Sequence, residues 1–319
     1  MANCWFCYQD AGDAEYHAKC SKRFFGIDKM PELVLNNNLL KELAEKTINK
    51  RIAVTGVQPK LSVTLEKSKE ENRLTIVGLW GEYILKPQHD RFPSMPETED
   101  LTMHLASLFR IKVCDHTLLK ATDGSLVYLA KRFDRVKGKK VHMEDLCQLS
   151  EFQTENKYKG SYEKAGKLIL KYCTNKGLDT LEYFEVVLFS YLTGNNDMHL
   201  KNFSVLHLEG SYELSPAYDL LNANLVNPKD DDELGLTISG KKKKIKLADF
   251  VTLADALNIP AKARENSFKK LSSATDRAND LIDRSFLTED EKVRYKEIWL
   301  QKQKIFGKTN PVINEYSIY

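Results

Sequence analysis

Asn195-Asn196-Asp197-Met198-His199-Leu200-Lys201-Asn202 is the stretch of this 319-residue chain that says most about its fold. It follows an apolar segment with helical spacing and is itself almost entirely polar. A second short motif, Pro216-Ala217-Tyr218-Asp219, follows downstream. Together the two motifs bring carboxylates, amide side chains and a lysine into a short length of chain.

The spacing within these motifs suits phosphoryl transfer. In the catalytic loop of protein kinases, an Asp that accepts the substrate proton precedes a Mg²⁺-binding Asn by five positions, and a later Asp holds the metal. Asp197 and Asn202 have that spacing. Asp197 is therefore a candidate base or substrate-orienting group, and Lys201 would neutralise phosphate charge. Asn202 and Asp219 would bind Mg²⁺.

Two readings of this loop stay open. His199 could belong to the site or could only brace the loop. The whole stretch could also be a polar turn that caps the apolar helix before it.

Bulk composition limits the class of protein. With 42% hydrophobic residues, the chain can form one large or two ordinary domains. A net charge of +3 makes no case for a dedicated nucleic-acid or membrane-surface binder. The longest apolar stretch, around residues 186–192, falls far short of the roughly 20 residues that span a bilayer. The amino terminus has no basic leader before a long apolar run, so we expect a cytosolic protein without a membrane partner.

Near the amino terminus, Cys4, Cys7, His17 and Cys20 form the pattern C-x2-C-x9-H-x2-C. Two close pairs of soft ligands that bracket a short loop suit tetrahedral Zn²⁺, because each pair can chelate from a tight turn. Such a site would be structural, since it leaves no open coordination position.

The alternative for this segment is a set of reduced thiols. Cys4 and Cys7 could lie in a small apolar patch with three aromatic residues, Trp5, Phe24 and Phe25. Six cysteines in a chain of this size, without an export signal, indicate thiols or metal ligands rather than a disulfide framework.

The periodicity beyond this segment predicts an α+β fold with two lobes. Residues 33–50 form a polar helix or connector, and short β-branched or aromatic segments then predict an antiparallel sheet at 61–65, 74–77, 83–86 and 126–130. Helical spacing occurs at 97–110, 181–192 and 247–257. We therefore expect three parts: a zinc-knuckle segment at 1–30, a β-rich amino-terminal lobe with the phosphate loop at 31–133 and a larger, mainly helical carboxy-terminal catalytic lobe at 134–319. A ligand would bind in the cleft between the lobes.

The β-rich lobe supplies candidate nucleotide contacts. The stretch Thr55-Gly56-Val57-Gln58-Pro59-Lys60 begins just before the first strand, where Gly56 could let backbone amides approach phosphates and Lys60 could add charge. Lys86 ends a strand and could contact phosphates, with Glu99 on the following helix to orient it. The alternatives are that Lys86 is an ordinary surface lysine and that Glu99 is an ordinary glutamate at the start of a helix.

Between the two lobes lies Lys131-Arg132-Phe133, which follows an apolar strand. These residues could present backbone groups to an adenine ring.

The ordered set of motifs resembles the HipA-like serine/threonine kinases, the toxin components of bacterial toxin–antitoxin modules, and in particular the short HipT form. The resemblance covers roughly residues 51–220. The matching features are Thr55-Gly56-Val57-Gln58-Pro59-Lys60, Tyr83-Ile84-Leu85-Lys86, Lys131-Arg132-Phe133-Asp134-Arg135, His142-Met143-Glu144-Asp145, the stretch from Asn195 to Asn202 and Pro216-Ala217-Tyr218-Asp219.

This resemblance implies a two-lobed kinase-like fold, ATP, Mg²⁺ and a protein hydroxyl as acceptor, with Asp197 catalytic. The ATP-binding residues that it implies are Thr55, Gly56, Val57, Gln58, Pro59, Lys60, Lys86, Lys131, Arg132, Phe133, His199, Leu200, Lys201, Asn202, Tyr218 and Asp219. It also implies a HipB-like helix-turn-helix antitoxin, through which any DNA contact would be indirect, and a separate HipS-like small partner. Known substrates in the family include aminoacyl-tRNA synthetases, so arrest of translation is the expected output.

Two positions depart from the family pattern. Ala53 stands where relatives often carry a Ser that is autophosphorylated, and alanine cannot accept phosphate. Either the chain relies on Thr55, or it lacks autophosphorylation in this loop, or Ala53 is an engineered substitution. Phosphate in the loop would repel ATP phosphates and eject the loop from the cleft. Lys131 stands where relatives commonly have Glu, which matters only if the side chain, and not the backbone, contacts adenine.

Three functions are weighed on these residues. The first is an active kinase toxin, which the retention of Lys86, Asp197, Asn202 and Asp219 favours. The second is a pseudokinase-like regulatory subunit that binds nucleotide or partners without transfer. The third, a zinc-containing nucleic-acid adaptor, is disfavoured by the near-neutral charge and the lack of a recognition-helix pattern.

Overall fold

The fold was analysed in a computed structural model of the chain. The structure describes residues 2–49, 60–68, 72–78, 80–136, 138–273 and 275–307, with the backbone alone described for 44–49. In the described part of the chain, no helix combines the length and the apolar character needed to cross a membrane.

The chain alternates short strands and helices in its first half and is mainly helical in its second half. The described helices are α1 (Ala18–Phe25), α2 (Asn37–Asn49), α3 (Met95–Leu108), α4 (Leu146–Leu149), α5 (Tyr162–Tyr172), α6 (Lys176–Leu192), α7 (Ala223–Val226), α8 (Leu247–Ala256), α9 (Ala261–Ser272), α10 (Thr275–Asp283) and α11 (Glu289–Gln303), with 3-10 turns η1 (Thr154–Asn156) and η2 (Leu200–Asn202). The described strands are β1 (Leu61–Lys67), β2 (Asn72–Val77), β3 (Tyr83–Lys86), β4 (His116–Lys120), β5 (Leu126–Lys131), β6 (Arg135–Val136), β7 (Lys139–Lys140), β8 (His142–Asp145), β9 (Ser204–Leu208) and β10 (Ser211–Leu214).

The amino-terminal lobe is built on an antiparallel sheet with the strand order β2-β1-β3-β5-β4. Alternation of apolar and polar residues sets its register, because one face of each strand must be buried. Leu61 pairs with Leu85 and Val63 with Tyr83, and all four side chains are buried. Helix α3 lies against β4 and β5. The predicted sheet and its helix are confirmed.

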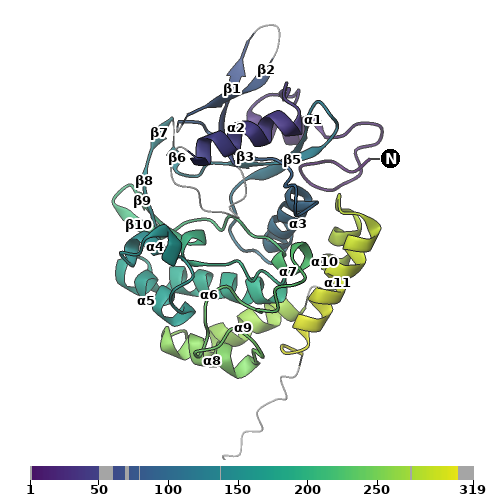
Figure 1. Cartoon of the computed structure of the whole chain (residues 1–319). Coiled ribbons are helices and arrows are strands. Elements are labelled where there is room, and N and C mark those ends of the chain that lie inside the picture. Colours follow the sequence, from purple (N-terminus) through teal and green to yellow (C-terminus); the bar gives the residue numbers. More distant parts are fainter. Residues whose placement is uncertain are drawn as a thin grey trace, which may run out of the picture.

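The segment before residue 30 is part of this lobe and packs against its sheet. Trp5, Phe6, Phe24 and Phe25 share one buried cluster with residues of β1, β3, β4 and β5. Figure 1 shows α1 and α2 beside the sheet in the upper half of the molecule. The amino-terminal segment therefore shares its hydrophobic core with the lobe, a contact that sequence periodicity did not predict.

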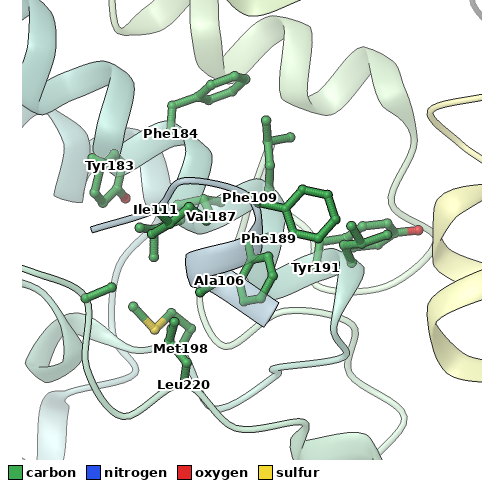
Figure 2. Packing of buried hydrophobic residues seen from close by; sticks show 14 of the residues in the cluster. Ala106, Phe109, Ile111, Tyr183, Phe184, Val187, Phe189, Tyr191, Met198 and Leu220 are labelled. Carbon is green, nitrogen blue, oxygen red and sulfur yellow. The ribbon is translucent and has the colours of Figure 1, made fainter. Parts of the chain in front are cut away.

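The carboxy-terminal lobe is organised around α6. The apolar face of this helix lies in the large core cluster, together with residues that follow α3. Figure 2 shows Phe109 and Ile111 beside Val187 of α6, with Met198 and Leu220 close below. Helices α10 and α11 return to contact α3 and α6. Because Met198 and Ala217 belong to this core, it anchors both motifs singled out in the sequence.

A two-lobed α+β fold is thus confirmed, with one element that periodicity missed. Strands β8, β9 and β10 form a small antiparallel sheet in the order β10-β9-β8, within a region expected to be helical. The strands have only 4 or 5 residues each, which is too few to distinguish the strand period from the helical period of the sequence around them. The sheet lies directly beside the 195–202 stretch, because β9 begins two residues after it.

Candidate active site

The ammonium group of Lys86 joins two carboxylates from different lobes. Its Nζ donates to Oε1 and Oε2 of Glu99 over 2.7 and 2.9 Å, and to Oδ1 of Asp219 over 2.6 Å. Lys86 ends β3 and Glu99 lies on α3, whereas Asp219 follows β10. Lys86 is 7% and Glu99 1% exposed. The cluster therefore links the two lobes through the buried Lys86–Glu99 pair and the partly exposed carboxylate of Asp219.

Burial and charge act against each other in this cluster. Burial raises the pKa of Glu99 to about 7, although the charge of Lys86 opposes the rise. Burial alone would lower the pKa of Lys86, but Asp219 and Glu99 outweigh it and raise that pKa. Burial alone would raise the pKa of Asp219, but Lys86 and Lys60 hold it well below its usual range. At neutral pH Lys86 is a cation and Asp219 an anion, while Glu99 lies near its titration midpoint.

Asp219 has a strained backbone that its neighbours hold in place. Its φ of 57° lies in the left-handed region, which non-glycine residues rarely adopt. The preceding Tyr218 donates a hydrogen bond to the carbonyl of Lys201 over 2.7 Å. The Tyr218 oxygen also lies 2.6 Å from Oγ of Ser204, and its ring centroid lies 5.4 Å from that of Phe133. Such strain concentrates at functional sites, where the surrounding structure fixes it.

The 195–202 loop is held from beneath through Met198. Tyr162 donates to the Met198 carbonyl over 2.8 Å, and the Met198 side chain is buried in the core. Gly235 passes so close that a Cβ there would lie 2.6 Å from the same carbonyl oxygen. Asn196 Nδ2 adds a bond of 3.0 Å to the carbonyl of Asp232. Only a residue without a side chain lets the two backbones approach in this way.

Asp197 projects from this loop as an exposed residue. The hydroxyl of Tyr158 donates a hydrogen bond to its Oδ1. The protein mass around the carboxylate raises the pKa of Asp197, and the negative charge of Asp219 adds to the rise, whereas the bond from Tyr158 lowers it. A carboxylate with a raised pKa that can hold a hydroxyl group is suited to general-base chemistry.

Asn202 lies across the loop from Asp197 and is 4% exposed. Its Nδ2 donates to the Asp197 carbonyl over 3.2 Å, which leaves the amide oxygen of Asn202 facing elsewhere. This oxygen, like Oδ2 of Asp219, accepts no hydrogen bond from any described residue. Two oxygen donors of the kind that Mg²⁺ prefers are therefore still available.

His199 and Leu200 differ in how the structure places them. Burial lowers the pKa of His199 to about 4, with help from Lys157, so the imidazole is neutral at pH 7. Its Nδ1 is buried and has no hydrogen-bond partner among the described residues. Leu200 is 2% exposed, and its N–H donates to the carbonyl of Lys157 over 3.2 Å. The Leu200 side chain thus belongs to the core, while His199 keeps an unused polar atom.

Lys201 is already paired in this structure. Its Nζ donates to Oδ2 of Asp145 over 2.8 Å, and its side chain is 32% exposed. Asp145 also caps α4, because its other oxygen accepts from the backbone of Gln148. If Lys201 neutralises phosphate charge as predicted, its ammonium group must interact with both the phosphate and Asp145.

The Lys131-Arg132-Phe133 segment offers fewer backbone groups than expected. The N–H of Lys131 donates to the Asp115 carbonyl and that of Arg132 to the Glu82 carbonyl, each over 2.8 Å. Strand pairing uses these donors, because β5 continues beside β3 up to Lys131. Of the three residues, Phe133 is the one whose N–H makes no hydrogen bond within the described part of the chain.

Part of the predicted nucleotide site lies outside the described residues. This part comprises Thr55, Gly56, Val57, Gln58 and Pro59, together with Ala53. Lys60 is described and exposed, and its charge helps to lower the pKa of Asp219.

A separate group of donors comes together near the amino terminus. One ligand atom from each of Cys4, Cys7, His17 and Cys20 lies within 4.8 Å of all the others.

Sequence reasoning missed three partners of the site. Tyr158 reaches Asp197 from 39 positions away in the sequence, and Gly235 lies beneath Met198. Asp145 stands inside a motif that the sequence singled out, but nothing there linked it to Lys201. Tyr158 and Gly235 carried no signal, because their contacts depend on how distant segments pack.

Comparisons with known proteins show which family and which proteins this chain resembles. The model of the HipA-like C-terminal domain family matches residues 52–279. A Haemophilus influenzae protein named "Putative kinase" is 29% identical over 186 residues, which cover 54% of this chain and 53% of that protein. The serine/threonine-protein kinase toxin HipA of Shewanella oneidensis is 26% identical over 196 residues, covering 55% of this chain and 44% of that protein.

A solved structure shows the same fold. HipA of Shewanella oneidensis, in a complex with HipB and its operator DNA, superposes with a TM-score of 0.67 at 22% identity. The superposition covers 83% of this chain and 71% of that one. The chain spans about half the length of the sequence relatives it matches.

Proposed function

Since the chain belongs to the family defined by the HipA-like C-terminal domain, we propose that it is an ATP- and Mg²⁺-dependent protein serine/threonine kinase. The observation that carries this proposal is the buried bridge from Lys86 to Glu99 and Asp219. Kinases use such a Lys–Glu pair to position the lysine on nucleotide phosphates, and they use a later Asp to hold the metal.

The donor set fits Mg²⁺. Asn202 and Asp219 would hold the ion through the two oxygens that accept no hydrogen bond from described residues. Hard oxygen ligands, few in number, suit Mg²⁺ because it keeps several waters and binds phosphates as well. When bound, the ion would neutralise phosphate charge. The low pKa of Asp219 keeps its carboxylate ionised for this role at any physiological pH.

The residues around ATP would divide the remaining tasks. Glu99 holds Lys86 toward the phosphates, and the 55–60 loop with Lys60 would cover them. His199 would supply Nδ1 and Phe133 its backbone N–H beside the ring of Tyr218, because neither group has a hydrogen-bond partner among the described residues. A nucleotide phosphate that binds Lys86 would compete with Asp219, since the two side chains are paired in this structure.

Asp197 would act as the base. Its carboxylate takes the proton from a protein hydroxyl as that oxygen bonds to the γ-phosphate and the bond to ADP breaks. The hydrogen bond from Tyr158 supports this assignment, because it demonstrates that a hydroxyl group can reach Oδ1 of Asp197. A substrate hydroxyl must take the place of Tyr158 at this oxygen.

We further propose that the kinase is the toxin of a toxin–antitoxin module. A HipB-like DNA-binding antitoxin and a HipS-like small partner would restrain it, and an aminoacyl-tRNA synthetase would be its substrate. The similarity to HipA of Shewanella oneidensis supports the antitoxin, because that protein is found with HipB and DNA. Induced expression in bacteria should stop incorporation of labelled amino acids, and co-expressed antitoxin should restore it.

The test of the catalytic assignment uses purified protein, Mg²⁺, bacterial lysate and ATP labelled on its γ-phosphate. Asp197→Asn should lower labelling of the substrate by at least about 100-fold, the range for loss of a general base. Asp255→Asn is the control, because Asp255 pairs with Arg264 on the surface of the carboxy-terminal lobe. Labelling that persists with Asp197→Asn would sink the assigned role of Asp197.

A pseudokinase-like regulatory subunit is the second candidate. One observation favours it: Lys86 and Lys201, the two lysines expected at the phosphates, are both paired with carboxylates. In this case calorimetry would detect ATP binding in the presence of Mg²⁺, while neither wild type nor Asp255→Asn would transfer label.

A further inference from the structure

Three thiols and an imidazole near the amino terminus have the spacing of ligands around a tetrahedral metal ion. The Cys7 and Cys20 sulfurs lie 3.8 Å apart, and Nδ1 of His17 lies 3.5 Å from Cys7 Sγ and 3.8 Å from Cys20 Sγ. Bonds of about 2.3 Å to sulfur and about 2.0 Å to nitrogen would place tetrahedral ligands about 3.5 to 3.8 Å apart. The separations thus fit Zn²⁺ and are too long for a disulfide bond.

The backbone around the first pair of ligands forms a chelating turn. The N–H groups of Cys7 and Tyr8 both donate to the carbonyl of Cys4, over 3.3 and 2.9 Å. Tyr8 then takes the left-handed conformation, with a φ of 58°. The N–H of His17 donates to Cys4 Sγ over 3.4 Å, which holds the second pair of ligands beside the first.

The second pair of ligands is oriented by α1 and by Asp10. Cys20 lies in the first turn of α1. His17 Nε2 lies 3.0 Å from the carbonyl oxygen of Asp10, so this nitrogen carries the proton and donates. Nδ1 is then left with its lone pair toward the thiols. Metal-binding histidines are commonly fixed by such an outer bond.

This cluster lies next to the helix that carries Glu99. Tyr8, directly after Cys7, is fully buried and donates from its hydroxyl to Oδ2 of Asp100 over 2.8 Å. Asp100 is the neighbour of Glu99 on α3, and its Oδ1 lies 2.6 Å from Nδ1 of His116. The centroid of the Tyr8 ring also lies 4.4 Å from that of His104 on the same helix, with the two rings tilted at 52°.

The same segment also contacts the strand that carries Lys86. The rings of Phe24 and Phe25, which end α1, each lie 5.7 Å from the ring of Tyr83 at the start of β3. The four ligands therefore close a segment that touches both elements of the Lys86–Glu99 pair. They lie outside residues 52–279, so the family match does not account for them.

We propose that Cys4, Cys7, His17 and Cys20 bind one structural Zn²⁺ ion, and that this ion fixes Tyr8 against α3 and so supports the Lys86–Glu99 pair. Without the ion, the turn from Cys4 to Tyr8 loses its closure, and Asp100 loses a buried donor. The effect on the Lys86–Glu99 pair concerns ATP and rests on the proposed function, whereas the metal site stands independently of it.

The metal site is tested by metal analysis of the full chain, purified in a thiol reductant without added zinc. We expect close to one Zn²⁺ per chain in wild type and in Cys147→Ser, and almost none in Cys20→Ser. Cys147 is a matched control, because its thiol donates to backbone carbonyls away from the cluster and a hydroxyl can do the same. After replacement of Zn²⁺ by Co²⁺, wild type and Cys147→Ser should show the visible absorption of a tetrahedral thiolate site. Cys20→Ser should not show it. Wild type without zinc, or Cys20→Ser with unchanged zinc, would overturn the proposal.

The link to α3 is tested with Tyr8→Phe, which keeps all four ligands. This variant should retain its zinc but exchange the backbone amides of α3 at least about 10-fold faster, and zinc removal from wild type should do the same. Unchanged α3 exchange in both would reject the link. Mg²⁺-ATP affinity should fall in parallel. If no variant binds ATP while zinc content and amide exchange behave as expected, the kinase assignment fails and the zinc site stands.

Discussion

Replacement of Glu99 by glutamine tests the Lys86–Glu99 bridge directly. Lys86 donates to both carboxylate oxygens of Glu99, over 2.7 and 2.9 Å, and glutamine keeps only one acceptor and no charge. A hydrogen bond to a charged group contributes about 1.5 to 3 kcal/mol. At about 1.4 kcal/mol per factor of ten, kcat/KM for ATP should fall roughly 10- to 150-fold at pH 8. Lys86 would then shift toward Asp219, which keeps its negative charge.

The pH dependence of this loss gives a second check. Because burial raises the pKa of Glu99 to about 7, its carboxylate is mostly protonated at pH 6 and mostly ionised at pH 8. The kcat/KM values of wild type and Glu99→Gln should therefore be similar at pH 6 and should differ at pH 8. The assay is steady-state phosphotransfer from labelled ATP, together with calorimetric Mg²⁺-ATP binding.

Glu97→Gln is the matched control for this experiment. Glu97 is also buried on α3, but its two oxygens accept from Gln88 and not from Lys86. Its replacement should leave kcat/KM close to that of wild type. Activity of Glu99→Gln within about twofold of wild type at pH 8, or an equal loss in Glu97→Gln, would refute the reasoning.

Three further predictions concern stability and the 195–202 loop. Burial raises the pKa of Glu97 to about 7, so folding holds its proton and wild type should lose stability as pH rises from about 4.5 to 7. In urea unfolding, the free energy of unfolding of Glu97→Gln relative to that of wild type should rise by roughly 2 to 3 kcal/mol between pH 4.5 and 8. A difference between the two proteins that does not change with pH would contradict this. Gly235→Ala should lower activity at least about 10-fold, because the added Cβ would displace the backbone of Met198 in the loop. Gly177→Ala is the control and should keep its activity, because a Cβ there meets open space. Equal activities of the two variants would argue against the close approach of Gly235 to Met198. Tyr158→Phe removes a bond that lowers the pKa of Asp197, so the acid limb of the pH–kcat/KM profile should move to higher pH; a move to lower pH would reject Tyr158 as its partner.

Sequence periodicity predicted the sheet of the amino-terminal lobe and the helices α3, α6 and α8, because each of these helices carries apolar residues at helical spacing. The strands of the amino-terminal lobe alternate, and α6 runs for 17 residues with an apolar face. Strands β8, β9 and β10 were missed, because 4 or 5 residues between helices carry too little pattern. The contact of the amino-terminal segment with the sheet was missed for another reason, since it joins parts of the chain that no local period relates.

For the site, the sequence identified residue types and their spacing, and the structure decided which groups meet. Asp197 and Asn202, like Cys4 and Cys7, are only a few residues apart in the sequence, and this limits how far apart their side chains can lie. Their spacing alone therefore made them candidates for metal or proton chemistry. The roles of the 55–59 loop and of Ala53 stay predictions, because these residues lie outside the described part of the chain.

The amino-acid sequence by itself determined the family, the order of its motifs and the strand or helix period of the main elements, because these depend on neighbours along the chain. Only the tertiary structure decided that Lys86 bridges Glu99 and Asp219, that Lys201 turns to Asp145 and that Tyr8 reaches Asp100. Contacts of this kind join residues as far apart as 133 positions. Their geometry and their pKa values follow from burial and from the charges that folding brings close, and neither is encoded in local spacing.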